Sequence, residues 1–258
     1  MLVRQNMHTH TRISYCGGRD STIANTVHEA ESVGLEMVGI SDHIDCIGSG
    51  REPLFQINRD ELATIDTNVK VLIGAELSIQ SPDALPAPAE FVESLDYVLI
   101  SANHFHVPCV MNPDEKTEEA YADWFLVMAD AAVGFGASII PHPFSYIGVR
   151  TMEGGREVDF PRLLKAYDRG KVRELFRKAS ERGTAFELNP GRMGYHDFFR
   201  ELFGIARDEG MKFSFGSDGH HPGAMDYGGI DKLAEIDAMF VELGVTDDII
   251  CHDYAVRR

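Results

Sequence analysis

The sequence predicts an α/β fold in which parallel strands alternate with helices and close into a barrel. About seven short apolar, β-branched runs are each followed by a helix-like stretch, which is typical of a parallel β/α architecture. Histidine, cysteine and acidic side chains recur mostly where these runs end. The length of 258 residues fits one barrel, so we expect a single domain over residues 1–258.

The first predicted strand carries the sequence His8-Thr9-His10. Alternate side chains of an extended strand project to the same face, so His8 and His10 can aim two imidazoles at one point while Thr9 faces away. The spacing alone is a weak signal, because two histidines at a strand end also serve as ordinary hydrogen-bonded residues. The other predicted strands are Met37 to Ile40, Val69 to Ala75, Tyr97 to Ala102, Ser138 to Pro141, Thr184 to Leu188 and Lys212 to Ser217.

The stretches between the strands have the apolar spacing of amphipathic helices. The first begins at a candidate N-cap, Ser21 or Thr22, and ends at a glycine, Gly34. The later stretches have basic or glycine residues near their ends, which favours helix termination there. The predicted helices are Ser21 to Gly34, Glu115 to Gly136, Pro161 to Arg182, Asp197 to Gly210 and Asp231 to Gly244.

Potential metal ligands accompany most of the predicted strands. In a closed barrel the carboxyl ends of the strands all lie at one face, which is where β/α barrels carry their chemistry. An open doubly wound sheet would instead spread the same side chains along a line. We therefore expect the ligands to converge on one metal centre. They are His8, His10, Cys16, His43, Glu76, His104, His142, Asp218 and His220.

The composition excludes several classes of partner. With 24 Lys and Arg against 41 Asp and Glu, the net charge is −17, so we expect no binding to a nucleic-acid polymer. No apolar run is long enough to span a membrane and no signal peptide is evident, so a cytoplasmic location is expected. The four cysteines are widely spaced and form no Cys-x-x-Cys motif, so no disulfide framework is predicted. The oligomeric state is not indicated.

The candidate ligands lie in six short motifs along the chain. They are His8-Thr9-His10-Thr11, Ser41-Asp42-His43, Gly74-Ala75-Glu76, Asn103-His104, Pro141-His142-Pro143 and Gly216-Ser217-Asp218-Gly219-His220. Taken in order, these motifs resemble those of the polymerase and histidinol phosphatase (PHP) superfamily over nearly the whole chain. The resemblance implies a distorted (β/α)7 barrel with a cluster of two or three divalent metal ions at the C-terminal face of the strands. The metals are commonly zinc, manganese or iron, and the usual activity is phosphoester hydrolysis.

The resemblance also implies how the ligands divide among the metals. One ion would be bound by His8, His10, Glu76 and Asp218. Glu76 would bridge to a second ion, whose remaining protein ligands would be His104 and His142.

A third ion would fall to His43, His220 and the position six residues after His10. Histidinol phosphate phosphatases typically have another histidine there, whereas this chain has Cys16. A thiolate binds zinc well, but a free cysteine also packs as a small apolar residue, and both interpretations stay open. Asp20 and Asp45 are near enough in sequence to supply an oxygen ligand instead.

The expected reaction is hydrolysis of a small phosphomonoester by a hydroxide that the metal cluster activates. Histidinol phosphate or a nucleotide is a candidate substrate. The expected catalytic residues are His43, Asp218 and His220, with one of the two histidines as general acid.

Arginine suits phosphate oxygens, and two arginines are the predicted substrate contacts. Arg192 follows Asn189-Pro190-Gly191, where the resemblance also places an arginine, and Arg156 lies in the loop after His142. Two alternatives stay open: a metal-dependent hydrolase of a non-phosphate substrate, and a non-catalytic PHP module.

Overall fold

A computed structural model of the protein describes residues 1–144, 148–149, 151–224 and 230–254. Its centre is one sheet of seven strands in the order β1 to β7, in which neighbouring strands are parallel. The strands are β1 (Gln5–Thr9), β2 (Met37–Ile44), β3 (Lys70–Ser78), β4 (Val98–Ser101), β5 (Ile139–Ile140), β6 (Ala185–Leu188) and β7 (Lys212–Phe215).

The first strand also meets the segment that follows the last one. Thr9 and Gly219 form a parallel bridge. The backbone N–H of His10 donates to the carbonyl of Gly219 at 2.7 Å, and Gly219 N–H donates to the carbonyl of His8 at 3.2 Å. These bonds bring the sheet close to a closed barrel, so the carboxyl ends of all strands face one end of it. The predicted (β/α)7 barrel is confirmed.

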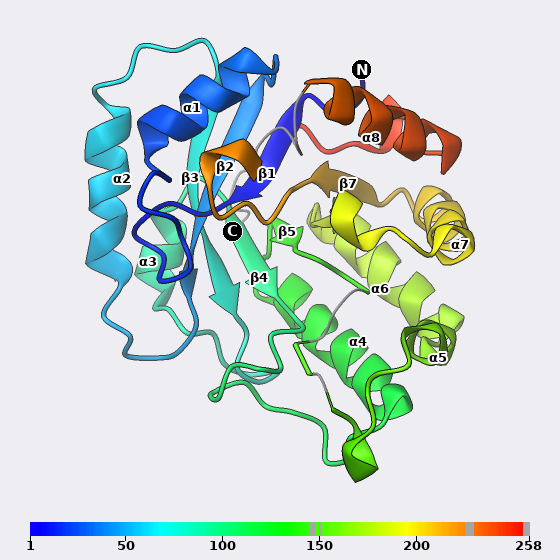
Figure 1. The fold of residues 1–258 in the computed structure, drawn as a ribbon. Helices are drawn as coiled ribbons and strands as arrows, with labels where there is room; N and C mark the ends of the chain where they lie inside the picture. Colours follow the sequence, from blue (N-terminus) through cyan, green and yellow to red (C-terminus); the bar gives the residue numbers. More distant parts are fainter. Residues whose placement is uncertain (145–147, 150, 225–229, 255–258) are drawn as a thin grey trace.

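Helices surround the sheet, with α1 and α2 on one side and α4 to α8 on the other (Figure 1). Threonine or aspartate side chains cap four of them, because an oxygen at the N-cap accepts an otherwise unpaired backbone N–H. No helix within the described ranges combines the length and the apolar character of a membrane span. The α-helices are α1 (Ile23–Ser32), α2 (Phe55–Leu62), α3 (Ala89–Glu93), α4 (Glu118–Gly134), α5 (Phe160–Ala166), α6 (Arg169–Arg182), α7 (His196–Asp208) and α8 (Ile230–Glu242).

A tyrosine packs across the interior of the barrel. Tyr97 is fully buried just before β4, and its hydroxyl donates to the carbonyl of Met7 on β1 at 3.0 Å. A Cβ at Gly39 or Gly74 would lie 2.3 Å or 2.4 Å from the Tyr97 side chain. The ring therefore requires glycine on both β2 and β3, because a side chain at either position would overlap it.

Three features differ from the expectations. The strands β2 and β3 extend beyond Ile40 and Ala75, so His43 and Glu76 lie inside strands. The predicted helix Pro161 to Arg182 is two helices, since Tyr167 and Asp168 are extended and the Asp168 side chain caps α6. Helices α2 and α3 were not predicted.

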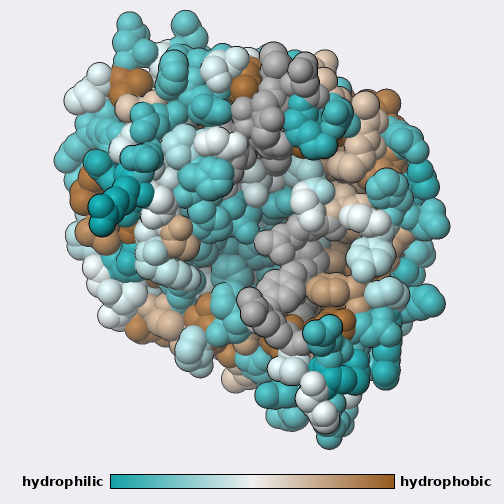
Figure 2. Space-filling view, viewed as in Figure 1, coloured by the Kyte–Doolittle hydropathy of each residue, from teal (hydrophilic) through white to brown (hydrophobic). Residues whose placement is uncertain are grey.

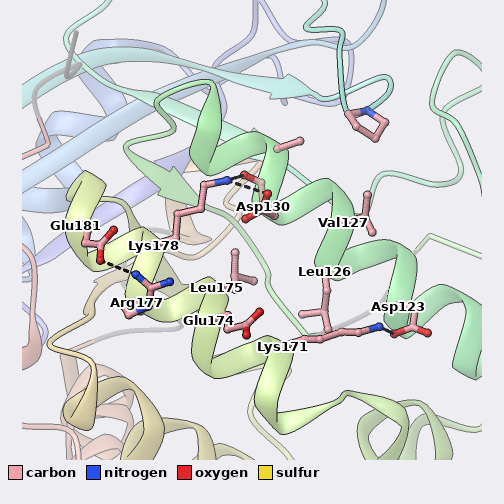
Figure 3. A pocket seen from close by; sticks show the side chains of 12 residues that line it. Asp123, Leu126, Val127, Asp130, Lys171, Glu174, Leu175, Arg177, Lys178 and Glu181 are labelled. Atoms are coloured by element: carbon pink, nitrogen blue, oxygen red, sulfur yellow. Dashed lines mark hydrogen bonds and ion pairs between the residues drawn. The ribbon is translucent and has the colours of Figure 1, made fainter.

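A surface groove of about 670 Å³ lies between α4 and α6, and none of the candidate metal ligands lines it. Its floor includes Leu126 and Leu175, as Figure 3 shows. Ion pairs cross the groove from Lys171 to Asp123 and from Lys178 to Asp130, each at 2.8 Å. Because these charges pair with each other, the groove presents no concentrated charge of one sign.

One disulfide corrects the expectation for the cysteines. Cys46, two residues after β2, is bonded to Cys109, which follows β4, with the Cα atoms 6.0 Å apart. The two positions are 63 residues apart in the chain and meet only because β2 and β4 end on the same side of the barrel. Within the described residues, neither Cys16 nor Cys251 forms a disulfide.

Removing this disulfide should destabilise the fold. Closing a loop of 63 residues restricts the unfolded chain, so replacing both Cys46 and Cys109 by Ser should lower the free energy of unfolding by about 4 kcal/mol. Denaturant unfolding measures the change, and reductant should shift the wild type but not the double variant. Cys251→Ser is the control for loss of a thiol. An unfolding midpoint that reductant leaves unmoved would show that the bond contributes nothing.

Candidate metal centre

Six of the seven strands bring a potential ligand to the same end of the barrel. The first strand provides two, because the Thr9 hydroxyl between them turns away and donates to the carbonyl of Gly39 at 2.8 Å. Residues that are distant in the sequence therefore lie close together at the strand ends. In strand order they are His8 and His10 (β1), His43 (β2), Glu76 (β3), His104 (after β4), His142 (after β5), and Asp218 and His220 (after β7).

Glu76 is the centre of this group. Its side chain is fully buried, and both carboxylate oxygens face imidazole nitrogens. The hydroxyl of Ser101 also donates to Oε1 at 2.5 Å. The distances to Oε2 are 3.3 Å from His8, 3.5 Å from His10 and 3.1 Å from His43, and those to Oε1 are 3.3 Å from His104 and 3.0 Å from His142.

The spacing around His8 and His10 fits one metal ion. A tetrahedral zinc ion with bonds of about 2.0 to 2.1 Å places its donor atoms about 3.3 to 3.4 Å apart. The distances from His8 Nε2 are 3.2 Å to His10 Nε2, 3.3 Å to Glu76 Oε2 and 3.6 Å to Asp218 Oδ1. Those from His10 Nε2 are 3.5 Å to Glu76 Oε2 and 3.3 Å to Asp218 Oδ1. These four residues fit the ligand set that the sequence predicts for the first metal.

Two more donor groups share residues with the first. One contains His43, Glu76 and His104, and the other His10, His43 and His220, with donor atoms within 4.8 Å of one another. Nδ1 of His43 lies 3.1 Å from Oε2 of Glu76, yet neither atom has a hydrogen-bond partner among the described residues. A buried polar atom without a partner is costly. Two such atoms facing each other are what a bound cation would satisfy, so the residues present fit a metal cluster.

The electrostatics keep Glu76 and His43 in metal-binding forms. Burial would raise the pKa of Glu76, but the imidazoles of His43, His8 and His104 outweigh it and hold that pKa well below its usual value. Burial lowers the pKa of His43 to about 3, so its ring is neutral at pH 7. Metals bind carboxylate and neutral imidazole, and both are present here. Burial lowers the pKa of His8 and His104, but the carboxylate of Glu76, joined at His8 by Glu187, outweighs burial and raises both pKa values, so a cation would have to displace a proton from these two rings.

Two ligands occupy a backbone conformation that L-residues rarely adopt. His142 has φ 34° and Asp218 has φ 54°. Non-glycine residues in this left-handed region are uncommon and cost free energy, and they cluster at functional sites. With this backbone conformation, the side chains of His142 and Asp218 lie against the other ligands of the cluster, shortly after β5 and β7.

A cavity of about 310 Å³ opens onto the cluster. The face seen in Figure 2 is recessed and hydrophilic near its middle. Tyr15 is 66% exposed and stacks on His43, with ring centroids 5.4 Å apart. The lining residues are Tyr15, Cys16, His43, Asn103, His104, His106, His142, Gly148, Asp218 and His220.

Cys16 lines this cavity but belongs to none of the three donor groups. Burial and the carboxylate of Glu76 raise the pKa of its thiol to about 12, so the thiol is protonated unless a cation displaces the proton. Its role as a ligand stays a prediction.

Two polar residues beside the cluster, Ser78 and Glu187, make contacts that were not predicted. The Ser78 hydroxyl donates to Asp45 at 2.6 Å and lies 2.7 Å from Nδ1 of His104. Glu187 on β6 contacts His8 and the backbone of His142. The only sequence signal for Glu187 is a carboxylate in an apolar strand, which demands a partner but does not identify it.

The two predicted substrate arginines have different surroundings. The side chain of Arg192 lies outside the described residues, and its backbone is in the turn Pro190–Arg192 directly after β6. Both terminal nitrogens of Arg156 donate to the carboxylate of Glu118, whose side chain is fully buried at the start of α4. Arg156 is not among the described residues that line the cavity, and this ion pair disfavours its predicted contact with substrate.

Fold and site together define a β/α barrel that binds metals at the carboxyl ends of its strands. Residues 6–239 match the model of the PHP domain family. A probable phosphatase of Acetivibrio thermocellus is 26% identical over 97% of this chain and 94% of its own length. Another probable phosphatase, from Caldanaerobacter subterraneus subsp. tengcongensis, is 25% identical over 85% of this chain and 78% of its own length.

A solved structure has the same fold. It is the histidinol phosphate phosphatase of Lactococcus lactis complexed with zinc, L-histidinol and phosphate, with a TM-score of 0.69 and 20% identity over 95% of each chain. Because the family model covers most of the sequence, this chain belongs to the PHP domain family, and it is an enzyme of that family, a hydrolase.

The ion pair of Arg156 should affect stability more than substrate binding. Its hydrogen bonds hold the pKa of Glu118 at about 2, below an ordinary value of 4.5. A depressed carboxyl pKa stabilises the fold above pH 4.5, and this stabilisation is lost as the pH falls toward 2. Arg156→Ala should therefore lower unfolding free energy at pH 7 and reduce the difference between pH 7 and pH 3.

Denaturant unfolding at both pH values measures the effect. Arg177→Ala is the control, since Arg177 pairs with the exposed Glu181 and its loss should change little. A raised KM with unchanged stability would instead support the substrate contact that the sequence predicts for Arg156.

Proposed function

We propose that this protein hydrolyses small phosphomonoesters with the help of two or three divalent metal ions, which are zinc, manganese or iron. One observation carries the proposal. A fully buried carboxylate, Glu76, lies 3.0 to 3.5 Å from five imidazoles, at the spacing of shared metal ligands. Membership of the PHP domain family and the probable phosphatases among the relatives support phosphate as the group attacked.

Each metal would have its own ligands. The first is assigned to His8, His10, Glu76 and Asp218. The second is assigned to Glu76, His104 and His142, and the third to His43, His220 and Cys16. When bound, such ions lower the pKa of water toward neutrality and neutralise the phosphoryl oxygens.

The chain's own residues would orient the substrate and move protons. The His220 side chain is 34% exposed at the cavity, while that of His43 is 8% exposed. His220 can therefore meet a leaving oxygen more readily and is the preferred general acid, with His43 as the alternative. A metal-bound imidazole nitrogen has no proton to donate, so this role applies when the third metal site is empty or when the other ring nitrogen faces the leaving oxygen. Asp218 lies 3.7 Å from Nε2 of His220 and would orient that ring.

Phosphate recognition also needs a cation outside the cluster. Among the described residues that line the cavity, none is lysine or arginine. Arg192 ends the short turn Pro190–Arg192 after β6, at the end of the barrel where the strand ends converge, and a guanidinium suits phosphate oxygens. We assign it the contact with the phosphoryl group. Histidinol phosphate and nucleotides both fall within this substrate class.

Loss of the shared carboxylate should abolish metal binding and activity together. Glu76→Gln removes one charge and one oxygen acceptor from the contacts of five imidazoles, so phosphatase activity should fall by more than about 100-fold and metal content should drop. Elemental analysis and a screen of phosphomonoesters measure both. Chelation should inactivate the wild type and added metal should restore it. Full metal occupancy without activity on any phosphoester would contradict the proposed function.

Arg192→Ala should weaken substrate binding without loss of metal. A charge-assisted contact that is equally strong in the ground and transition states raises KM when it is removed and leaves kcat nearly unchanged. The measurement is steady-state kinetics beside the metal content of the same preparation. Unchanged kinetics would remove Arg192 from the site.

A further inference from the structure

We propose that Glu187 is a positioning residue that fixes one ligand in each of two metal sites. The inference rests on the proposed function, because it concerns the same metal centre. β6 is the one strand of the seven that supplies no ligand to the centre, and Glu187 is the charged residue on it. Glu187 is 1% exposed, and its neighbours on the strand, Phe186 and Leu188, are buried in the apolar core.

The two oxygens of Glu187 have separate partners. Oε1 lies 2.7 Å from Nδ1 of His8, and Oε2 accepts the backbone N–H of His142 at 2.6 Å. A carboxylate only accepts hydrogen bonds, so Nδ1 of His8 must carry the proton in this contact. The Nε2 lone pair of a neutral His8 is then left toward His10 and Glu76, 3.2 and 3.3 Å away.

The second contact acts on a strained backbone. His142 has φ 34°, and its Nε2 lies 3.0 Å from Oε1 of Glu76. The hydrogen bond from its N–H to Glu187 stabilises that conformation at the point where the side chain turns inward. A single carboxylate thus sets the tautomer of a ligand to the first metal and the backbone of a ligand to the second.

The neighbouring strand leaves room for this carboxylate. A Cβ at Gly216, which follows β7, would lie 2.0 Å from Oε1 of Glu187 and 2.8 Å from Cβ of His8. Glycine at 216 therefore permits the contact between Glu187 and His8. His104 has a comparable contact with the hydroxyl of Ser78, which itself donates to Asp45, so on that side of the cluster a hydroxyl stands between the imidazole and the carboxylate.

The test is Glu187→Gln, which keeps the shape and removes one acceptor. If its oxygen accepts from His142, its amide N–H faces Nδ1 of His8 and favours the tautomer with no lone pair at Nε2. If its oxygen accepts from His8, its amide opposes the N–H of His142. Either arrangement should weaken metal binding by about 10- to 100-fold.

Titration of apoprotein with Co²⁺ gives the affinity, the stoichiometry and the ligand-field spectrum without reliance on activity. We expect weaker binding, a changed spectrum and a folded protein by circular dichroism. Glu118→Gln is the matched control, because it neutralises another buried carboxylate that is paired with Arg156 instead of the cluster. It should reduce stability and leave Co²⁺ affinity unchanged.

A second measurement needs no variant. In zinc-loaded protein labelled with ¹⁵N at histidine, nuclear magnetic resonance should show His8 protonated at Nδ1. Protonation at Nε2 would overturn the inference, as would wild-type affinity, stoichiometry and spectrum in Glu187→Gln. In both cases the proposed function would stand. A wild-type protein that binds no divalent metal would overturn both.

Discussion

The structure depends on a buried carboxylate, that of Glu76, surrounded by five imidazoles. A charge without solvent is costly unless it is paired, and burial alone would neutralise it. Here the imidazoles hold its pKa low, and they come from β1, β2 and the segments after β4 and β5. Because those strands must all end beside β3, the requirement for charge compensation ties the barrel's closure to the assembly of the metal centre.

The site was more predictable than the details of the fold. Strand ends in a β/α barrel converge, so a histidine or glutamate near the end of an apolar run already indicates a neighbour. Glu76 and His142 are predicted as candidate ligands on this ground. Glu76 was expected after the end of its strand, whereas the strand continues to Ser78. The strand is longer because its polar end is buried by the neighbouring ligands, and hydropathy along the chain does not record that burial.

Other features depend on contacts between distant segments, which one sequence does not encode locally. The bond between Cys46 and Cys109 requires the ends of β2 and β4 to be close, and the cysteine spacing gives no sign of it. The break before α6 arises from the Asp168 cap, which interrupts an otherwise continuous helical pattern. The ion pair between Arg156 and Glu118 is likewise a tertiary contact, and the position of an arginine near a motif does not indicate it.

Whether Cys16 is a metal ligand depends on how many donor atoms the third site has. A neutral imidazole has one lone pair, so His10 cannot serve the first metal and also the group with His43 and His220. If His10 binds the first ion, that third group keeps two histidines, and a tetrahedral site needs further donors. Cys16 lines the same cavity, and the pKa of about 12 that burial gives its thiol means that only a bound cation would ionise it. A third ion and the thiolate therefore depend on each other, whereas the ligand sets proposed for the first two ions include neither.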